Sequence, residues 1–212
     1  MRIVAGIYGG RLIKAVPSKE TRPTTDRVRE AWASVVEGLM STNLTPAGLK
    51  DATVCDVFAG SGALGIEMLS RGAGRVVFCE QRKQAQKILR ENLDSLDVLD
   101  SANTHVITAD VFGSKAQAKL ADCGPYELLI LDPPYATDYA QIAELLGNLV
   151  FRAAIKPDGL ISYEQSAARR LPDAEMSLWL KSISSPADTS FILETRKLYG
   201  TVALDYFRYF AK

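Results

Sequence analysis

The stretch Cys55-Asp56-Val57-Phe58-Ala59-Gly60-Ser61-Gly62-Ala63-Leu64-Gly65 decides the fold that we expect for this chain. It begins in a short apolar run typical of a buried strand and continues through a glycine-rich turn into a helix-like segment. Gly60, Gly62 and Gly65 have the spacing of the dinucleotide-binding fingerprint, and Glu80 lies twenty residues after Gly60. Glycines let the backbone approach a ligand there, and an acid at that distance can accept hydrogen bonds from ribose hydroxyls. The stretch therefore predicts a Rossmann-like unit.

Strand-like and helix-like segments alternate with short connections from residue 53 onward. We expect strands at 54–58, 75–79, 104–108, 127–131 and 160–163, and helices at 63–71, 82–96, 113–121 and 138–154. This alternation predicts an α/β fold with a parallel sheet covered on both faces. Near the end of the chain, 177–184 and 198–207 are predicted as two further strands, with a loop at 185–191. They would form an antiparallel hairpin that closes one sheet edge, with Gly200 near its turn or at a bulge.

The first 45 residues are predicted as a small basic extension, and residues 46–212 as the main domain. Residues 1–16 indicate a β-hairpin, and a helix capped by Thr24 or Thr25 would run to about Met40. The first 30 residues hold seven basic and three acidic side chains, in a chain whose formal net charge is zero. Such a basic end indicates a local contact with a polyanion. Candidate contact residues are Arg11, Arg22, Thr24, Arg27 and Arg29; the alternative is that the arginines serve packing and ion pairs.

Acidic residues follow the first three predicted strands at Asp56, Glu80 and Asp110. They favour S-adenosylmethionine over NAD, because Asp56 can meet the methionine ammonium but would repel a pyrophosphate. Asp110 can contact the adenine amine, while Phe58 could either cover the ligand or belong to the core. Because the carboxyl ends of parallel strands share one sheet edge, we expect these acids and Asp132 to meet there.

The tetrapeptide Asp132-Pro133-Pro134-Tyr135 directly follows the fourth apolar run. Pro133 forces Asp132 into an extended conformation, and neither proline has an N–H, so the segment offers mainly acceptors. The Asp132 carboxylate and the Pro133 carbonyl could hold the two N–H groups of a nucleobase amine, with Tyr135 stacked on the base. The alternative is a rigid strand-to-loop turn without a chemical role.

The composition is that of a globular chain of 212 residues, 47% hydrophobic and 24% charged. No apolar run has the length of a membrane span, and the N-terminus lacks a signal-peptide core, so we expect a cytoplasmic protein. One histidine and three cysteines without paired spacing make a metal site unexpected. Cys55 and Cys79 lie in apolar runs, which argues against the cysteine nucleophile that pyrimidine C5 methylation requires. No oligomer seam is visible, and a monomer is expected.

The chain resembles the RsmD family, methyltransferases that modify guanine N2 in bacterial small-subunit (16S) ribosomal RNA. The matching stretches are Gly10-Arg11-Leu12, Arg22 to Glu30, Asp56 to Gly65, Asp132 to Tyr135 and Tyr199-Gly200. The resemblance implies a seven-stranded Rossmann-like S-adenosylmethionine-dependent methyltransferase domain and an N-terminal extension that helps to hold RNA. It also implies that the substrate is a partly assembled ribosomal subunit. One departure is the span 184–196, which has more residues than the family pattern and is interpreted as a surface insertion.

Two other classes remain open at this stage. The same tetrapeptide also serves DNA methyltransferases that act on adenine N6 or cytosine N4, although no large target-recognition domain is present. A binding protein that keeps the fold without turnover is the third possibility, against which the complete acidic set argues.

Overall fold

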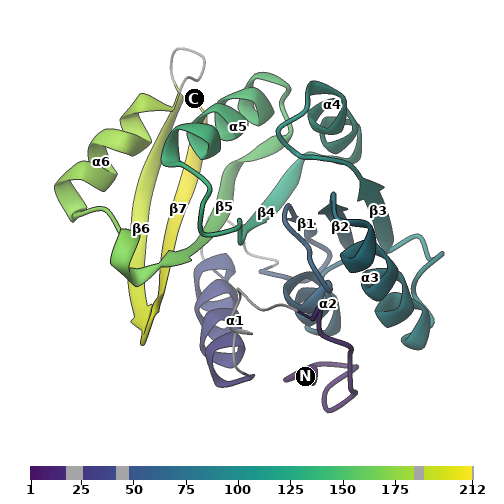
Figure 1. Ribbon diagram of the computed structural model, residues 1–212. Helices are drawn as coiled ribbons and strands as arrows, with labels where there is room; N and C mark the ends of the chain where they lie inside the picture. Colours follow the sequence, from purple (N-terminus) through teal and green to yellow (C-terminus); the bar gives the residue numbers. More distant parts are fainter. Residues whose placement is uncertain (18–25, 42–47, 184–188, 212) are drawn as a thin grey trace. The chain divides into compact units, whose positions relative to one another are not determined.

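The computed structural model describes residues 1–17, 26–41, 48–183 and 189–211 (Figure 1). The chain divides into two compact units, Met1–Asp110 and Val111–Lys212. Each unit is described by itself below. Arg22, Thr24 and residues 184–188 lie outside the described residues. The predicted boundary near residue 45 stays a prediction.

The first unit contains three parallel strands in the order β3-β2-β1. Its elements are α1 (Asp26–Met40), β1 (Thr53–Asp56), α2 (Ala63–Ser70), β2 (Arg75–Glu80), α3 (Lys83–Ser95) and β3 (Thr104–Thr108). The β2 register places Val76 beside Val54 of β1 and beside Thr104 of β3. Helix α2 packs on β1 and β2, and nearly all residues of β1 and β2 are buried. Continuous apolar burial on both faces is what a parallel strand requires, as the sequence predicts.

The N-terminal segment docks onto helix α2 of this unit. Arg2 and Leu12 form an isolated antiparallel bridge, so the predicted hairpin is present only as a short turn rather than as two strands. The buried Glu67 carboxylate accepts the backbone N–H groups of Val4 (2.8 Å) and Ala5 (3.1 Å). These bonds satisfy backbone donors that a turn cannot pair within itself, and they hold the segment against the helix.

The second unit contains four strands in the order β4-β5-β7-β6. Its elements are α4 (Ser114–Cys123), β4 (Tyr126–Leu131), α5 (Tyr139–Phe151), β5 (Ile155–Ser166), the 3-10 turn η1 (Ala167–Arg169), α6 (Asp173–Ser182), β6 (Thr189–Tyr199) and β7 (Val202–Ala211). Strands β4 and β5 are parallel, whereas β7 is antiparallel to both β5 and β6. The expected mostly parallel α/β sheet of seven strands with a C-terminal antiparallel hairpin is confirmed.

The first strand of that hairpin was predicted in the wrong place. Residues 177–184 were predicted as a strand, but Asp173–Ser182 is helix α6, which lies alongside β6 (Figure 1). Met176, Trp179 and Leu180 are its buried residues, a helical spacing that places them on one face. The hairpin strand is Thr189–Tyr199 instead, and Gly200 adopts a positive φ of 62° in the turn, as expected. Residues 189–196 of the supposed insertion therefore belong to β6.

Trp179 is the centre of an aromatic cluster in the second unit. Its ring lies 5.3 Å from Tyr139, 6.1 Å from Tyr163 and 5.9 Å from Phe207, measured between ring centroids. The indole N–H donates to the Tyr139 carbonyl at 3.0 Å. The Tyr139 and Phe207 contacts are edge-to-face, whereas the Tyr163 ring is stacked on the indole. Buried aromatic rings contribute large apolar area in both arrangements, so this cluster fixes α5 and α6 on the sheet.

Candidate functional site

The glycine-rich turn connects β1 to α2 in the first unit. Gly60 and Gly62 have positive φ values of 55° and 83°, a region that side chains rarely adopt. A Cβ added at Gly60 would meet nothing nearer than 4.0 Å, so this side of the turn is open to a ligand. A Cβ added at Gly65 would lie 2.4 Å from Cε1 of Phe78 on β2. The three glycines therefore serve different purposes: the turn, the approach of a ligand and the packing of α2 on the sheet.

The carboxylates at the ends of β1 and β2 accept hydrogen bonds from the backbone of Gly60 and Gly65. Asp56 is 1% exposed, and its carboxylate accepts the Gly65 N–H at 3.0 Å. The Glu80 carboxylate accepts the Gly60 N–H at 2.8 Å through one oxygen and the Arg82 N–H at 2.7 Å through the other. These bonds hold two carboxylates at the turn, where the Glu80 oxygens can accept further donors from a ligand.

Three acidic residues of this unit lie close enough to Cys79 to affect the pKa of its thiol. Burial of its thiol, together with the negative charges of Glu80, Asp110 and Asp56, raises the pKa of Cys79 to about 12. Asp110 itself is exposed after β3, and Phe58 is half-buried. The thiol stays protonated at neutral pH and is therefore unsuited to act as a nucleophile.

The tetrapeptide follows β4 in the second unit. Asp132 is half-buried, Pro133 is buried, and Pro134 and Tyr135 are exposed at the surface. Burial raises the pKa of the Asp132 carboxyl to about 6. The pKa of Tyr135 is also raised, first by burial and then by the negative charges of Glu164 and Asp132. The segment thus presents a carboxylate that is ionised at neutral pH but binds a proton more readily than an ordinary aspartate.

An open pocket of about 260 Å³, a volume that includes solvent at its mouth, adjoins the tetrapeptide within the same unit. Its lining residues are Pro133, Pro134, Tyr135, Thr137, Tyr139, Tyr163, Glu164, Gln165, Ser166 and Arg169. Four of these residues come from the end of β5, and Glu164 is only 6% exposed. Glu164 was not singled out from the sequence, although it directly follows the strand expected at 160–163. An acid directly after a predicted strand was the available signal, the same one that points to Glu80.

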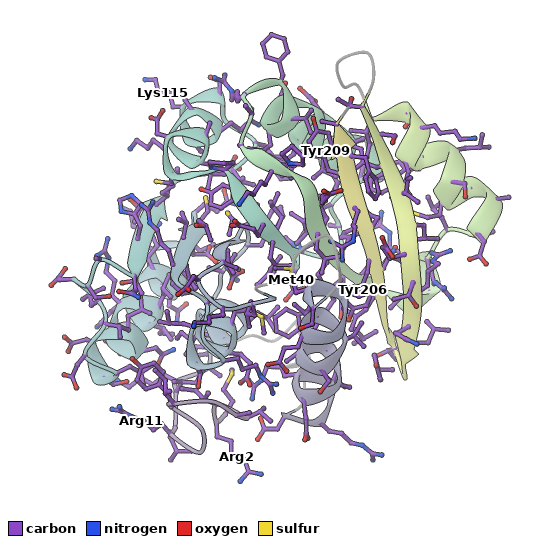
Figure 2. The ribbon with its side chains drawn as sticks, turned by 180° about the vertical axis from the view of Figure 1, so that it is seen from behind. Arg2, Arg11, Met40, Lys115, Tyr206 and Tyr209 are labelled. Carbon is purple, nitrogen blue, oxygen red and sulfur yellow. The ribbon has the colours of Figure 1, made fainter. Side chains whose placement is uncertain are left out.

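The predicted contact arginines have different environments. Arg11 projects outward from the N-terminal turn (Figure 2), and Arg27 is exposed on the first turn of α1. Arg29, in contrast, is 2% exposed and donates to the Arg2 carbonyl at 2.6 Å and to the Asp26 carboxylate at 2.5 Å. Its guanidinium therefore fits the alternative of packing and ion pairing.

Two absences can be stated for the described ranges. In them, no group of histidine, cysteine, aspartate and glutamate side chains could hold a metal ion. The same part of the chain contains no helix that is both long and apolar enough to span a bilayer.

Comparison with known proteins identifies the family that this chain matches. Residues 1–185 match the family described as conserved hypothetical protein 95. The chain is 30% identical to "Ribosomal RNA small subunit methyltransferase D" of Escherichia coli, over 94% of this chain and 92% of that protein. It is 32% identical to the protein of the same name from Haemophilus influenzae, over 85% and 86%. The solved structure of the Escherichia coli protein yhhF covers 100% of this chain and 99% of its own, with a TM-score of 0.68 and 28% identity.

Proposed function

This chain belongs to the RsmD family of ribosomal RNA methyltransferases, and on that premise we propose the reaction that it performs. It transfers a methyl group from S-adenosylmethionine to the exocyclic N2 of a guanine in small-subunit ribosomal RNA. The substrate is an assembling subunit in the cytoplasm, and the protein acts as a monomer. The observation that carries the proposal is the Asp132-Pro133-Pro134-Tyr135 segment, which offers acceptors and an aromatic ring beside a pocket.

The first unit holds the residues that fit S-adenosylmethionine. Open space at Gly60 leaves room for the ligand, and the remaining lone pairs of Glu80 suit ribose hydroxyls. Asp56 would meet the methionine ammonium, Asp110 the adenine amine, and Phe58 an adenosine face. When it is bound, S-adenosylmethionine supplies an electrophilic methyl group on a positively charged sulfur.

The second unit holds the residues that fit the acceptor amine. The Asp132 carboxylate and the Pro133 carbonyl accept its two N–H groups, which directs the nitrogen lone pair away from them and toward the methyl group. Tyr135 stacks on the base and fixes its plane. Orientation of this kind supplies much of the acceleration, because a delocalised amine attacks only from a restricted direction.

Asp132 also stabilises the positive charge that develops on the nitrogen. With a pKa of about 6, its carboxylate is ionised at neutral pH yet is a better proton acceptor than an ordinary aspartate. We propose that it takes the amine proton after transfer. The bond from the methyl carbon to sulfur breaks as the bond to nitrogen forms, which leaves a neutral thioether and, after deprotonation, a neutral methylated amine.

Methyl transfer from radiolabelled S-adenosylmethionine tests the proposal. The substrates are naked small-subunit RNA, assembling small subunits and duplex DNA, and the labelled product is digested to nucleosides. We expect N2-methylguanosine from the RNA-containing substrates. Label in DNA alone would instead identify an amino-methyltransferase of DNA, and no label in any substrate would identify a binding protein.

The role of Asp132 is tested with Asp132→Ala. We expect turnover to be lost while the affinity for S-adenosylmethionine, measured by calorimetry, stays nearly unchanged. The control is Asp122→Ala, which changes an exposed aspartate at the end of α4 in the same unit. Normal turnover of Asp132→Ala would contradict the assigned role.

A further inference from the structure

Glu164 lies beside the tetrapeptide by strand pairing. In the parallel ladder of β4 and β5, Leu131 is the register partner of Tyr163. The next residue on each strand is Asp132 on one side and Glu164 on the other. Neighbouring strands lie about 4.8 Å apart, and partners in a parallel ladder point to the same side of the sheet. The register therefore places Glu164, which lines the pocket, next to Asp132, and the other three residues of the tetrapeptide line the same pocket.

Two other polar residues of the pocket, Gln165 and Arg169, have partners within the second unit. The Gln165 amide donates to the Asp205 carboxylate at 2.6 Å, and its oxygen accepts the Tyr139 hydroxyl. Arg169 is paired with Asp138 at 3.3 Å near the surface. Glu164 adds a carboxylate to the pocket, which Tyr135, Tyr139 and Tyr163 line with aromatic rings.

The edge of guanine that carries the N2 amine presents a second donor, because the adjacent ring nitrogen N1 carries a hydrogen. In adenine and in cytosine, the ring nitrogen next to the exocyclic amine is an acceptor without a hydrogen. A carboxylate at that position attracts the first arrangement and repels the second. Two neighbouring carboxylates therefore match two neighbouring donors on a single base edge.

We propose that the Glu164 carboxylate accepts the N1–H of the target guanine and thereby selects guanine against bases with an acceptor at that position. This inference rests on the proposed function, since it concerns the same base in the same pocket. The raised pKa of Tyr135, in which the charge of Glu164 takes part, supports the closeness of the carboxylate to the stacking ring. A hydrogen bond to a buried charge contributes enough to change discrimination measurably.

The test uses a base that keeps the N2 amine of guanine but has no hydrogen on N1. The methylated guanosine is first mapped by mass spectrometry, and a ligated small-subunit RNA then carries 2,6-diaminopurine at that position. This base keeps the N2 amine, but its N1 is an acceptor. We expect the wild-type protein to prefer guanine over 2,6-diaminopurine in kcat/KM by about tenfold to a hundredfold. RNA with inosine, which keeps N1–H but has no amine, should compete for binding better than RNA with 2,6-diaminopurine.

Glu164→Gln supplies the residue-level test. Its amide can turn an N–H toward an acceptor N1, so the preference for guanine should shrink to less than about threefold, mainly through lower kcat/KM on guanine. Affinity for S-adenosylmethionine should match that of the control Glu144→Gln, which changes an exposed glutamate on α5.

Each other outcome has a distinct meaning. Failure of the wild-type protein to methylate guanine in any RNA would overturn the proposed function itself. Equal methylation of guanine and 2,6-diaminopurine by the wild type would overturn only the role of Glu164, even if the variant does not fold. A Glu164→Gln protein that keeps the wild-type preference, or loses cofactor affinity together with activity, would show that Glu164 is structural.

Discussion

Replacing Asp132 by asparagine should stabilise the protein at neutral pH while it impairs catalysis. Burial raises the pKa of Asp132 from 3.8 to about 6 in the folded protein. The folded state therefore holds this proton more tightly than the unfolded chain does. The resulting stabilisation is fully present below about pH 3.8 and is lost as the pH rises through about 6. At neutral pH the wild-type protein thus carries an ionised, partly desolvated carboxylate, whereas Asp132→Asn does not.

The magnitude follows from the two pKa values. At about 1.4 kcal/mol per pH unit, a difference of about 2 units corresponds to about 3 kcal/mol, and solvent at this half-buried group lowers it to about 2 kcal/mol. For a chain of this size, we expect a rise in the unfolding temperature of about 4 to 8 °C at pH 8. Because the wild-type carboxyl is partly protonated at pH 5, the gain there should be about half as large.

The assay is thermal and urea unfolding of both proteins at pH 8 and pH 5, with Asp122→Asn as the matched control on the exposed end of α4. Methyl transfer is measured on the same samples. A variant that is no more stable than the control at pH 8 would refute the reasoning. A gain of equal size at both pH values would do so as well, since it would not come from ionisation.

Three further predictions concern the first unit. Gly65→Ala should destabilise the fold by about 1 to 3 kcal/mol in urea unfolding, because its new Cβ would overlap the core. Gly60→Ala has room for its Cβ but keeps a positive φ of 55°, so it should destabilise the fold by about 1 kcal/mol and also weaken cofactor binding in calorimetry. Glu80→Gln should lower the affinity for S-adenosylmethionine by about tenfold or more by removing a charged acceptor, and unchanged affinity would exclude it from the ribose site. Arg27→Ala should weaken RNA binding and reduce the slope of log binding constant against log salt concentration by about one. Arg29→Ala should chiefly lower the unfolding midpoint, because its side chain is buried.

The local sequence was sufficient to predict structure where a motif requires one backbone conformation. The glycine turn needs positive φ at Gly60 and Gly62, and only that residue type accepts it cheaply, so the turn and its flanking elements could be predicted within about two residues. The helix that begins at Asp173 also had a start signal, with Pro172 before it and acids in its first turn. Apolar residues near Trp179 happen to satisfy both alternating and helical spacing, and the strand interpretation was wrong there.

The register between neighbouring strands could not be predicted from the sequence. The position of Glu164 beside Asp132 follows only from the register in which β5 pairs with β4. Likewise, Arg27 and Arg29 are equivalent in a charge count, but only one of them faces solvent after α1 packs. Buried polar residues of this kind are determined by which elements meet, and a pattern along one segment does not contain that information.

The attachment of the N-terminal segment bears on how RNA would be held. Gly6 sits against the end of α2 so closely that an added Cβ would lie 1.8 Å from the Ser70 carbonyl oxygen, and Glu67 holds the preceding backbone. Arg11 is tied to the Ser95 carbonyl at the end of α3. Because α2 begins directly after the glycine turn at Gly62, the arginine is presented from the same rigid unit as the proposed cofactor site. A basic group held in this way loses less conformational entropy on binding phosphate than one on a flexible arm, so few contacts can contribute to affinity efficiently.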